Sequence, residues 1–395
     1  MKKMLILGAG VYQVPLIRRA KAMGLYVTAA SRPGPYPGFS LADEVWPYDT
    51  TDTAAILKKA SETGIDGVCT TGTDVAVRTI GVLNETLGLT GIRSRAARIL
   101  TDKALMKEAF RGRVSSTPFR VIRKDSDIEE AVSELGFPLM VKACDVSGSR
   151  GILRVERYEE VMPAVMEARR VTSTDHILME RAAAGVEIGL DGYIRNGKAV
   201  LSLPHIKYVE HAGAVTVPVG HSFPYRAPQK ILSELSDQLQ RIADASGMTD
   251  GAVNCDIMVS KDGVTVIEAG GRCGATGIPE LIGMHTGIDY YEQILKGALG
   301  EEPDFTAVKA RPCISRLLMS PFDGVVDSVD EEMLDRVRKK TGADISIDVK
   351  PGDRVCAMRN GTDRIGQILL YSGSEQEALQ AVRGALSCIH ITRMV

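Results

Sequence analysis

The hydrophobic positions near the N-terminus fall into short continuous runs separated by a helical pattern. An apolar run over residues 3–7 enters a glycine turn, a helical pattern covers about 12–23, and a second apolar run follows at 25–29. Strand, helix and strand in this order predict a parallel sheet. The turn lacks the third glycine of a dinucleotide-binding loop, so the pattern does not favour that cofactor.

The C-terminal part alternates short apolar runs with two amphipathic helical patterns. The clearest runs are 313–319, 345–349 and 367–371, and the helical patterns cover 331–340 and 375–386. Strands and helices of this kind predict a small α+β domain that packs on the core. We expect this domain to close a cleft or to make a dimer contact.

A predicted hairpin carries two acidic residues on one face. Apolar runs flank Lys261-Asp262-Gly263, and an Asp-Gly turn between such runs predicts two paired strands. Asp256 and Glu268 then lie on neighbouring strands and face the same side. Two carboxylates on an apolar sheet repel each other, and a divalent cation such as Mg²⁺ relieves this. The alternative is a surface hairpin with solvated acids. Arg272, just beyond, offers a planar fork for phosphate or carboxylate.

A strand that ends in a lysine precedes a loop of small residues in the middle of the chain. Residues 137–143 form an apolar run with Lys142 near its end, where a buried ammonium is costly unless an anion meets it. The next residues, 147–151, include two glycines, so their backbone N–H groups can converge on a phosphate. A helix is predicted over 96–110, and Lys103 inside it would by itself be a solvated helix residue.

Another predicted strand ends in Glu180, and Glu187 follows after a short crossing. Such a pair can place one carboxylate near an amino purine and the other near ribose hydroxyls, although the pattern is weak on its own.

The totals are those of an ordinary globular protein of two or three domains. The chain has 395 residues, a formal charge of −2, and 25% charged and 44% hydrophobic residues. The absence of a basic excess gives no reason to expect nucleic acid, and no apolar run is long enough to span a membrane. Seven scattered cysteines without a CxxC pair favour reduced thiols and a cytoplasmic location. A homodimer is the default expectation.

These residues occur in the order seen in ATP-grasp enzymes, and in this the chain resembles that family. The chain looks similar to ATP-grasp carboxylate–amine ligases, in the branch that contains carbamoyl-phosphate synthetase halves, glycinamide ribonucleotide synthetase and dipeptide ligases. The resemblance rests on the following positions: Lys103, Val141-Lys142-Ala143, the loop Ser147-Gly148-Ser149-Arg150-Gly151, Glu180 to Glu187, Asp256, and Ile267-Glu268-Ala269-Gly270-Gly271-Arg272.

The resemblance implies a fold and its boundaries. It implies an ATP-grasp fold of the α/β and α+β class, with an N-terminal parallel-sheet pre-grasp domain over 1–95. The ATP-grasp domain would cover 96–310, with a lid subdomain at about 113–180. The small α+β C-terminal domain would cover 311–395.

The resemblance also implies roles for individual residues. Lys103 and Lys142 would contact the ATP phosphates. The adenine amino group would meet Glu180, and the ribose would meet Glu187. The other implied ATP contacts are a mobile lid made of Ser147, Gly148, Ser149, Arg150 and Gly151, and the backbone at Arg181 and Ala183 against the adenine ring.

The implied metal site departs from the usual pattern of the family. Asp256 and Glu268 would hold Mg²⁺, or Mn²⁺ in its place, and Arg272 would steady an acyl-phosphate and its tetrahedral successor. The family commonly has Glu-x-Asn-Pro-Arg at this point, with the Asn as a third metal ligand. Gly270 stands in place of that Asn, which puts the two-metal arrangement in doubt but not ATP binding.

Two further places carry candidate residues with open alternatives. His205 and Lys207 lie in a histidine-rich segment that we interpret as the wall facing the second substrate, near the reacting phosphate; ordinary loop residues are the alternative. Asp74 follows a short apolar run and is a candidate substrate contact, with helix N-capping as the alternative.

The function implied is an ATP- and Mg²⁺-dependent, ADP-forming ligase. It would join a small carboxylic acid, plausibly an amino acid, to an amine through an acyl-phosphate. The alternatives are a bicarbonate-activating carboxylase-type enzyme and a purine-type ligase acting on a phosphoribosylamine. A non-catalytic nucleotide-binding regulatory protein is the alternative from another class, and Gly270 is its only support.

Overall fold

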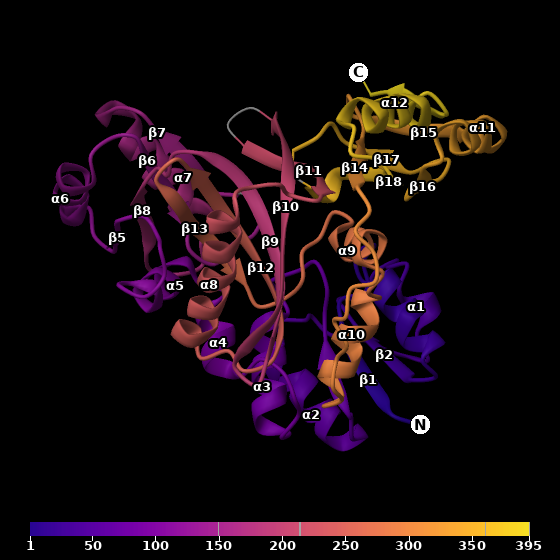
Figure 1. Ribbon diagram of the computed structural model, residues 1–395, viewed down its shortest axis with the longest axis horizontal. Coiled ribbons are helices and arrows are strands. Elements are labelled where there is room, and N and C mark those ends of the chain that lie inside the picture. Colours follow the sequence, from indigo (N-terminus) through magenta and orange to yellow (C-terminus); the bar gives the residue numbers. More distant parts are fainter. Residues whose placement is uncertain (149, 213–214, 360, 395) are drawn as a thin grey trace. The chain divides into compact units, whose positions relative to one another are not determined.

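The computed structural model describes residues 1–148, 150–212, 215–359 and 361–394 (Figure 1). The contacts divide the chain into two compact units. The first contains Met1–Pro204, Ala227–Gly274 and Tyr291–Phe305, and the second contains His205–Arg226, Ala275–Tyr290 and Thr306–Val395. In the described part of the chain, no helix is both long and apolar enough to cross a membrane.

The N-terminal part of the first unit is the predicted parallel sheet. Its strand order is β3-β2-β1-β4, and all the pairs are parallel. Its strands are β1 (Lys3–Leu7), β2 (Tyr26–Ala30), β3 (Glu44–Trp46) and β4 (Gly67–Cys69). Its helices are α1 (Val14–Ala22), α2 (Thr53–Thr63) and α3 (Val77–Thr86), with a short 3-10 turn, η1 (Phe39–Leu41). Pro15 lies in the first turn of α1, which explains why the helix begins two residues later than predicted.

The chain then forms two short helices and a second, antiparallel sheet of order β5-β8-β6-β7. The short helices are α4 (Ser94–Ile99) and α5 (Lys103–Phe110). The sheet consists of β5 (Phe119–Ile122), β6 (Leu139–Ala143), β7 (Ile152–Val155) and β8 (Ile177–Arg181). Its helices are α6 (Ser126–Leu135), α7 (Val161–Val171) and the 3-10 turn η2 (Tyr158–Glu160). The two α-helices and the sheet share one hydrophobic core.

The single helix predicted over 96–110 is wrong, because two helices occupy this stretch. Asp102 has an extended backbone, and its carboxylate accepts hydrogen bonds from the backbone N–H groups of Ala104 and Leu105. An acidic side chain in this arrangement caps a helix, so a new helix starts at Lys103. Lys103 is therefore the first residue of α5 and is buried, rather than a solvated residue in a helix interior.

Long antiparallel strands complete the first unit. They pair in the order β13-β12-β9-β10, and α8 (Gln229–Ser246) packs against β9 and β13. These strands are β9 (Val186–Arg195), β10 (Lys198–Ala212), β12 (Gly251–Ser260) and β13 (Gly263–Gly270). β10 continues into the second unit, since the division falls after Pro204. The helix α10 (Tyr290–Ala298) belongs to the first unit apart from its first residue.

The second unit contains the C-terminal α+β structure. Its strands include β11 (Val215–Phe223), β14 (Cys313–Met319), β16 (Asp344–Ile347) and β18 (Arg364–Leu370), in the order β11-β14-β18-β16. A separate sheet is made of β15 (Gly324–Val329), β17 (Arg354–Val355) and β19 (Ile389–Arg393). The helices are α9 (Ile278–Thr286), α11 (Glu331–Thr341) and α12 (Glu375–Leu386), with the 3-10 turn η3 (Gly361–Asp363). One hydrophobic core joins α11 and α12 to these strands. The mixed α/β and α+β fold class is thus confirmed; the proposed domain boundaries stay a prediction.

Candidate active site

Asp256 and Glu268 are direct partners across the β12–β13 hairpin. The two-residue turn at Lys261 and Asp262 joins the strands, as the Asp-Gly signal predicted, and a register shift between Asp256 and Ile257 then brings Asp256 opposite Glu268. Directly opposed residues of an antiparallel pair project from the same face. The two carboxylates therefore share one face, as expected, and the regular ladder is interrupted just beyond Asp256. Oxygen donors of this kind suit Mg²⁺, so the side chains present fit the ion that the resemblance implies.

Lys103 connects the start of α5 to this hairpin. Its Nζ lies 3.0 Å from Glu268 Oε1 and donates to the carbonyl oxygen of Val146 at 2.9 Å. Burial opposes the charge on this ammonium, but Glu268 and Asp74 outweigh that effect and raise the pKa of Lys103. Lys103 is therefore a fixed cation beside one of the two candidate metal ligands.

A buried charge group lies on the neighbouring sheet and α5. Glu180 forms ion pairs with Lys142 and with Lys107, whose Nζ is 2.7 Å from Glu180 Oε2. Thr117 donates its hydroxyl to the same carboxylate at 2.7 Å. Burial alone would raise the pKa of Glu180, but the two ammonium groups lower it to about 2. Glu180 thus holds Lys142 in place, and its contact with adenine stays a prediction.

The loop between β6 and β7 is built as a glycine-containing turn. Gly148 and Gly151 both have positive φ, at 72° and 63°, where residues with a side chain are strained. Arg150 donates to the carbonyl oxygen of Ser147 at 3.2 Å across the turn. Ser149, which belongs to the predicted phosphate loop, lies outside the described residues.

A pocket of about 360 Å³ brings several of the predicted residues together within the first unit. Lys103, Ser147 and Glu268 line it, and Asp74 and Arg78 contribute from the N-terminal part. The other lining residues are Thr51, Thr53, Val75, Thr79, Leu100, Thr101, Asp102, Met106, Asp145, Val146 and Ser173. The pocket therefore contains a cation, a candidate metal ligand and the start of the predicted phosphate loop.

The residues predicted to contact adenine and ribose lie where the chain passes from β8 to β9. Arg181 ends β8, where its backbone N–H donates to the carbonyl oxygen of Pro118 and its side chain donates to that of Leu135. Ala183 lies between the two strands, and Glu187 is the second residue of β9, opposite Met258 of β12. The order of these positions is as predicted, and their nucleotide contacts stay a prediction.

Arg272 is half-buried in a network of polar side chains. Its guanidinium donates to Asp74 Oδ2 at 2.8 Å and to Asn254 Oδ1 at 3.0 Å. Asn254 in turn donates to Asp191 at 2.7 Å, and Asp191 accepts the backbone N–H of Gly274 at 2.8 Å. Burial disfavours the charge, but Asp74 outweighs this and raises the pKa of Arg272. The guanidinium is therefore rigidly oriented before any substrate arrives.

The structure changes the interpretation of Asp74. α3 begins at Val77 without a side-chain cap, so the helix-capping alternative is wrong. The carboxylate binds Arg272 instead and lines the pocket that contains Glu268.

The remaining predicted catalytic residues lie in the second unit. His205 and Lys207 are two residues apart on β10 and therefore face the same side of the strand. Lys207 is opposite His221 of β11, and the rings of His205 and His221 meet edge to face with centroids 4.8 Å apart. Burial, followed by the charges of His205 and Lys207, lowers the pKa of His221 well below its usual value. The proposed roles of His205 and Lys207 stay predictions.

Sequence reasoning missed Lys107 and Asn254. Lys107 follows Lys103 by four residues, so the two share one helix face, and this spacing was the available signal. Asn254 precedes Asp256 by two residues and therefore faces the same side of β12. Both were overlooked because a lysine in a helix and an asparagine in a strand are usually ordinary surface residues.

Comparisons with known proteins identify two regions of the chain. Residues 135–280 match the ATP-grasp domain, and residues 316–393 match the L-amino acid ligase C-terminal domain 2. An uncharacterised protein of Sinorhizobium fredii, y4rH, is 25% identical over 358 residues, which are 88% of this chain and 73% of that protein.

Two solved structures resemble the chain over its full length. Phosphoribosylglycinamide synthetase from Anaerococcus prevotii has a TM-score of 0.80 at 25% identity, with 100% of both chains covered. L-amino acid ligase from Bacillus licheniformis has a TM-score of 0.82 at 19% identity, with 100% of this chain and 99% of that chain covered.

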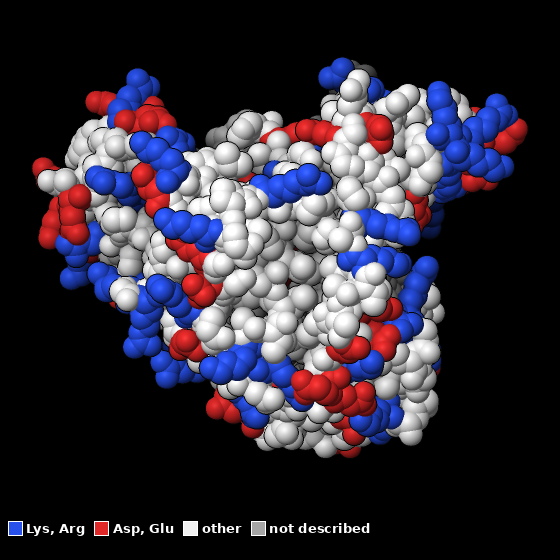
Figure 2. Space-filling model, viewed as in Figure 1, with Lys and Arg blue, Asp and Glu red and all other residues white. Residues whose placement is uncertain are grey.

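The face in Figure 2 carries interspersed acidic and basic side chains.

Proposed function

Because the chain belongs to the ATP-grasp superfamily of ADP-forming carboxylate–amine ligases, we propose that it joins a small amino acid or related carboxylic acid to an amine. The match of residues 316–393 to an L-amino acid ligase domain supports an amino acid as the acid partner. A homodimer and a cytoplasmic location stay predictions.

The observation that carries this proposal is the placement of Glu268. It faces the same side as Asp256, lies 3.0 Å from Lys103 Nζ and lines a pocket with the start of the phosphate loop. A cation beside one carboxylate, in a pocket that the start of a glycine-containing loop also lines, is suited to a triphosphate carrying a divalent ion. Mg²⁺ held by Asp256 and Glu268 would neutralise phosphate charge.

The chemistry requires positioning more than a protein nucleophile. A carboxylate becomes electrophilic when the γ-phosphoryl group is transferred to it, and an amine then displaces phosphate from the mixed anhydride. The phosphoryl and carboxyl oxygen atoms carry the negative charge that develops during this transfer, so fixed cations provide most of the transition-state stabilisation. We assign Lys103 and Lys142 to the phosphates and Arg272, already oriented by Asp74, to the acyl-phosphate.

The test is phosphate release from Mg-ATP with amino acids, other small carboxylates and bicarbonate, each alone and in pairs with amines. We expect release that requires one acid and one amine together, with the coupled product seen by mass spectrometry. Release with bicarbonate alone would assign the chain to the carboxylase type, and release with a phosphoribosylamine and an amino acid would assign the purine type. Tight ATP binding without release across the panel would favour the non-catalytic alternative.

A further inference from the structure

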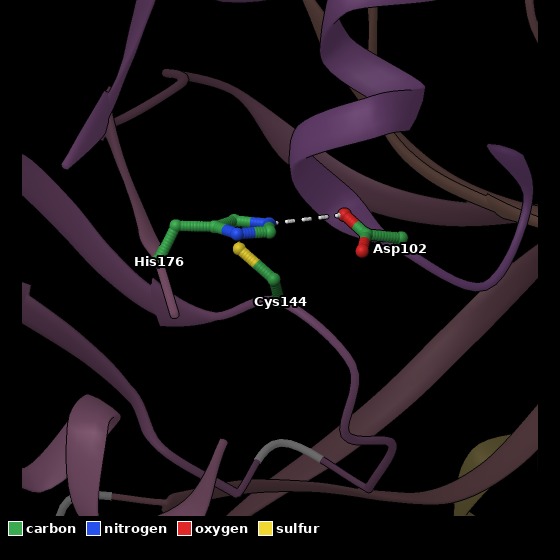
Figure 3. Close-up of side chains that lie close together, drawn as sticks. All are labelled: Asp102, Cys144 and His176. Atoms are coloured by element: carbon green, nitrogen blue, oxygen red, sulfur yellow. Dashed lines mark ion pairs between the residues drawn. The ribbon is translucent and has the colours of Figure 1, made fainter. Parts of the chain in front are cut away.

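Three potential metal ligands from three separate segments meet beside the start of α5. Asp102 precedes the helix, Cys144 follows β6 and His176 precedes β8 (Figure 3). One ligand atom from each residue lies within 4.8 Å of the other two. Asp102 and Cys144 are buried, and the side chain of His176 is 12% exposed. In the described part of the chain this is the one group of three such residues that meets this distance condition.

One hydrogen bond of the His176 ring indicates which nitrogen faces the group. Nδ1 lies 2.7 Å from Asp175 Oδ1, and because an ionised carboxylate accepts only, Nδ1 carries the proton. Histidine that binds a metal through one nitrogen usually donates its other N–H to a carboxylate in this way.

The other nitrogen of His176 has no hydrogen-bond partner among the described residues. Nε2 is buried and lies 3.7 Å from Asp102 Oδ1, beyond hydrogen-bond distance. Asp102 Oδ1 also accepts the backbone N–H groups of Ala104 and Leu105. A proton or a metal ion on Nε2 would satisfy the contact with this oxygen, and the sulfur of Cys144 beside both residues favours a metal ion.

We propose that Asp102, Cys144 and His176 bind one Zn²⁺-type transition-metal cation. Thiolate sulfur, imidazole nitrogen and carboxylate oxygen are the three ligand types that zinc prefers. Asp102 also lines the pocket of about 360 Å³, so water can provide a fourth ligand. This site is chemically distinct from the Asp256–Glu268 pair, whose oxygen donors suit Mg²⁺.

The proposed cation would bind next to Lys103, because two of its ligands contact the start of α5. Asp102 caps α5, and the backbone N–H of Lys103 donates to the carbonyl oxygen of Cys144 at 2.9 Å. Two of the three ligands therefore flank the residue that contacts Glu268. Binding should stabilise this segment, since an ion that binds only the folded protein raises its stability.

The experiment uses Co²⁺, which gives an intense thiolate charge-transfer band, added to the reduced full-length protein in excess Mg²⁺. We expect one equivalent of Co²⁺ to produce the band and Zn²⁺ to displace it. Cys144→Ser should abolish the band, whereas Cys356→Ser, at a half-buried cysteine outside the group, should leave it unchanged. His176→Gln should weaken Co²⁺ binding at least 10-fold, and Asp175→Asn about 10- to 100-fold, because outer carboxylates tune ligand orientation.

A wild-type protein that shows no thiolate–cobalt band at one equivalent would overturn the proposal, and so would a band that persists in Cys144→Ser. If Cys144→Ser does not fold, the wild-type band and the His176→Gln affinity decide the matter. Unchanged Co²⁺ affinity in a folded His176→Gln protein would also overturn it. These readouts do not require ligase activity, so the result is independent of the proposed function.

Discussion

The carboxylate of Asp74 occupies the space that a side chain at Gly270 would need, because a Cβ atom at position 270 would lie 2.8 Å from Asp74 Oδ1. Asp74 also binds Arg272 at 2.8 Å, two residues further along. Gly270 therefore replaces the Asn of the Glu-x-Asn-Pro-Arg pattern at a place where Asp74, from the N-terminal part of the same unit, takes up the space. An asparagine at 270 and the Asp74–Arg272 pair compete for one volume.

Gly270→Ala tests this competition. The added methyl group must displace Asp74, so we expect a loss of about 1–3 kcal/mol in the free energy of unfolding, as for overpacked sites. Asp74→Ala removes the obstacle, so adding Gly270→Ala to that variant should cost much less. Denaturant unfolding of the four proteins in this cycle measures the coupling. Additive effects would contradict the shared volume.

Glu268→Gln should lower turnover strongly while the fold survives. The substitution keeps the shape but removes the charge that faces Lys103 and the candidate metal. Loss of one such electrostatic contact costs on the order of 10²–10³ in rate. Phosphate release measures turnover, and circular dichroism measures folding. Asp262→Asn, in the turn of the same hairpin, is the matched control and should keep full activity. Normal turnover in Glu268→Gln would remove Glu268 from the site.

The buried Glu180 should make stability depend on acid pH. Its pKa is lowered from 4.5 to about 2 in the folded protein, so its contribution is complete above pH 4.5 and is lost as the pH falls toward 2. Glu180→Gln should flatten this part of the unfolding profile and destabilise the protein at pH 7 by about 3–5 kcal/mol, because two buried ammonium groups lose their partner.

Urea unfolding across pH 2–7 measures this effect. Glu301→Gln, at an exposed ion pair with Lys2, is the control and should keep the wild-type profile. If Glu180→Gln does not fold, Lys107→Met provides a second variant, because it leaves the Glu180–Lys142 pair intact. The slope below pH 4.5 should then remain. Its absence in Lys107→Met would contradict the assignment of the slope to Glu180.

Lys207→Met tests the cluster on β10 and β11. The charge of Lys207 contributes to the low pKa of His221, so its removal should move that pKa upward, although burial keeps it below the usual value. NMR titration of the histidine resonances measures the shift. For the proposed ligase, kcat should fall while the KM for ATP stays near that of the wild type. An unchanged His221 pKa would show that Lys207 does not act on this ring.

The sequence predicted those parts of the site that depend on local pattern. The Asp-Gly turn predicted the β12–β13 hairpin, but Asp256 lies opposite Glu268 because the register shifts between Asp256 and Ile257, which the turn does not set. The strand-end lysine at 142 was recognisable because a buried ammonium needs a partner. In both cases the informative residues are close together along the chain.

The parts that escaped prediction depend on contacts between distant segments. Asp74 and Arg272 are 198 residues apart, and no local pattern shows that they form a pair. The partners of Cys144 come from before α5 and before β8. The break before Lys103 was missed because the helical pattern of apolar residues continues across the cap at Asp102.

The buried group of Lys107, Lys142 and Glu180 contains two lysine side chains and one carboxylate. When both lysines are protonated the group has an excess positive charge of one, and burial lowers the pKa of Lys107 in response. Without a nucleotide, the folded protein holds this excess away from water at a cost in free energy. A polyphosphate that reaches the group would remove the cost. The nucleotide would then act as a missing counter-ion of the fold as well as a substrate, and the empty protein would be the less stable form during storage and in the cell.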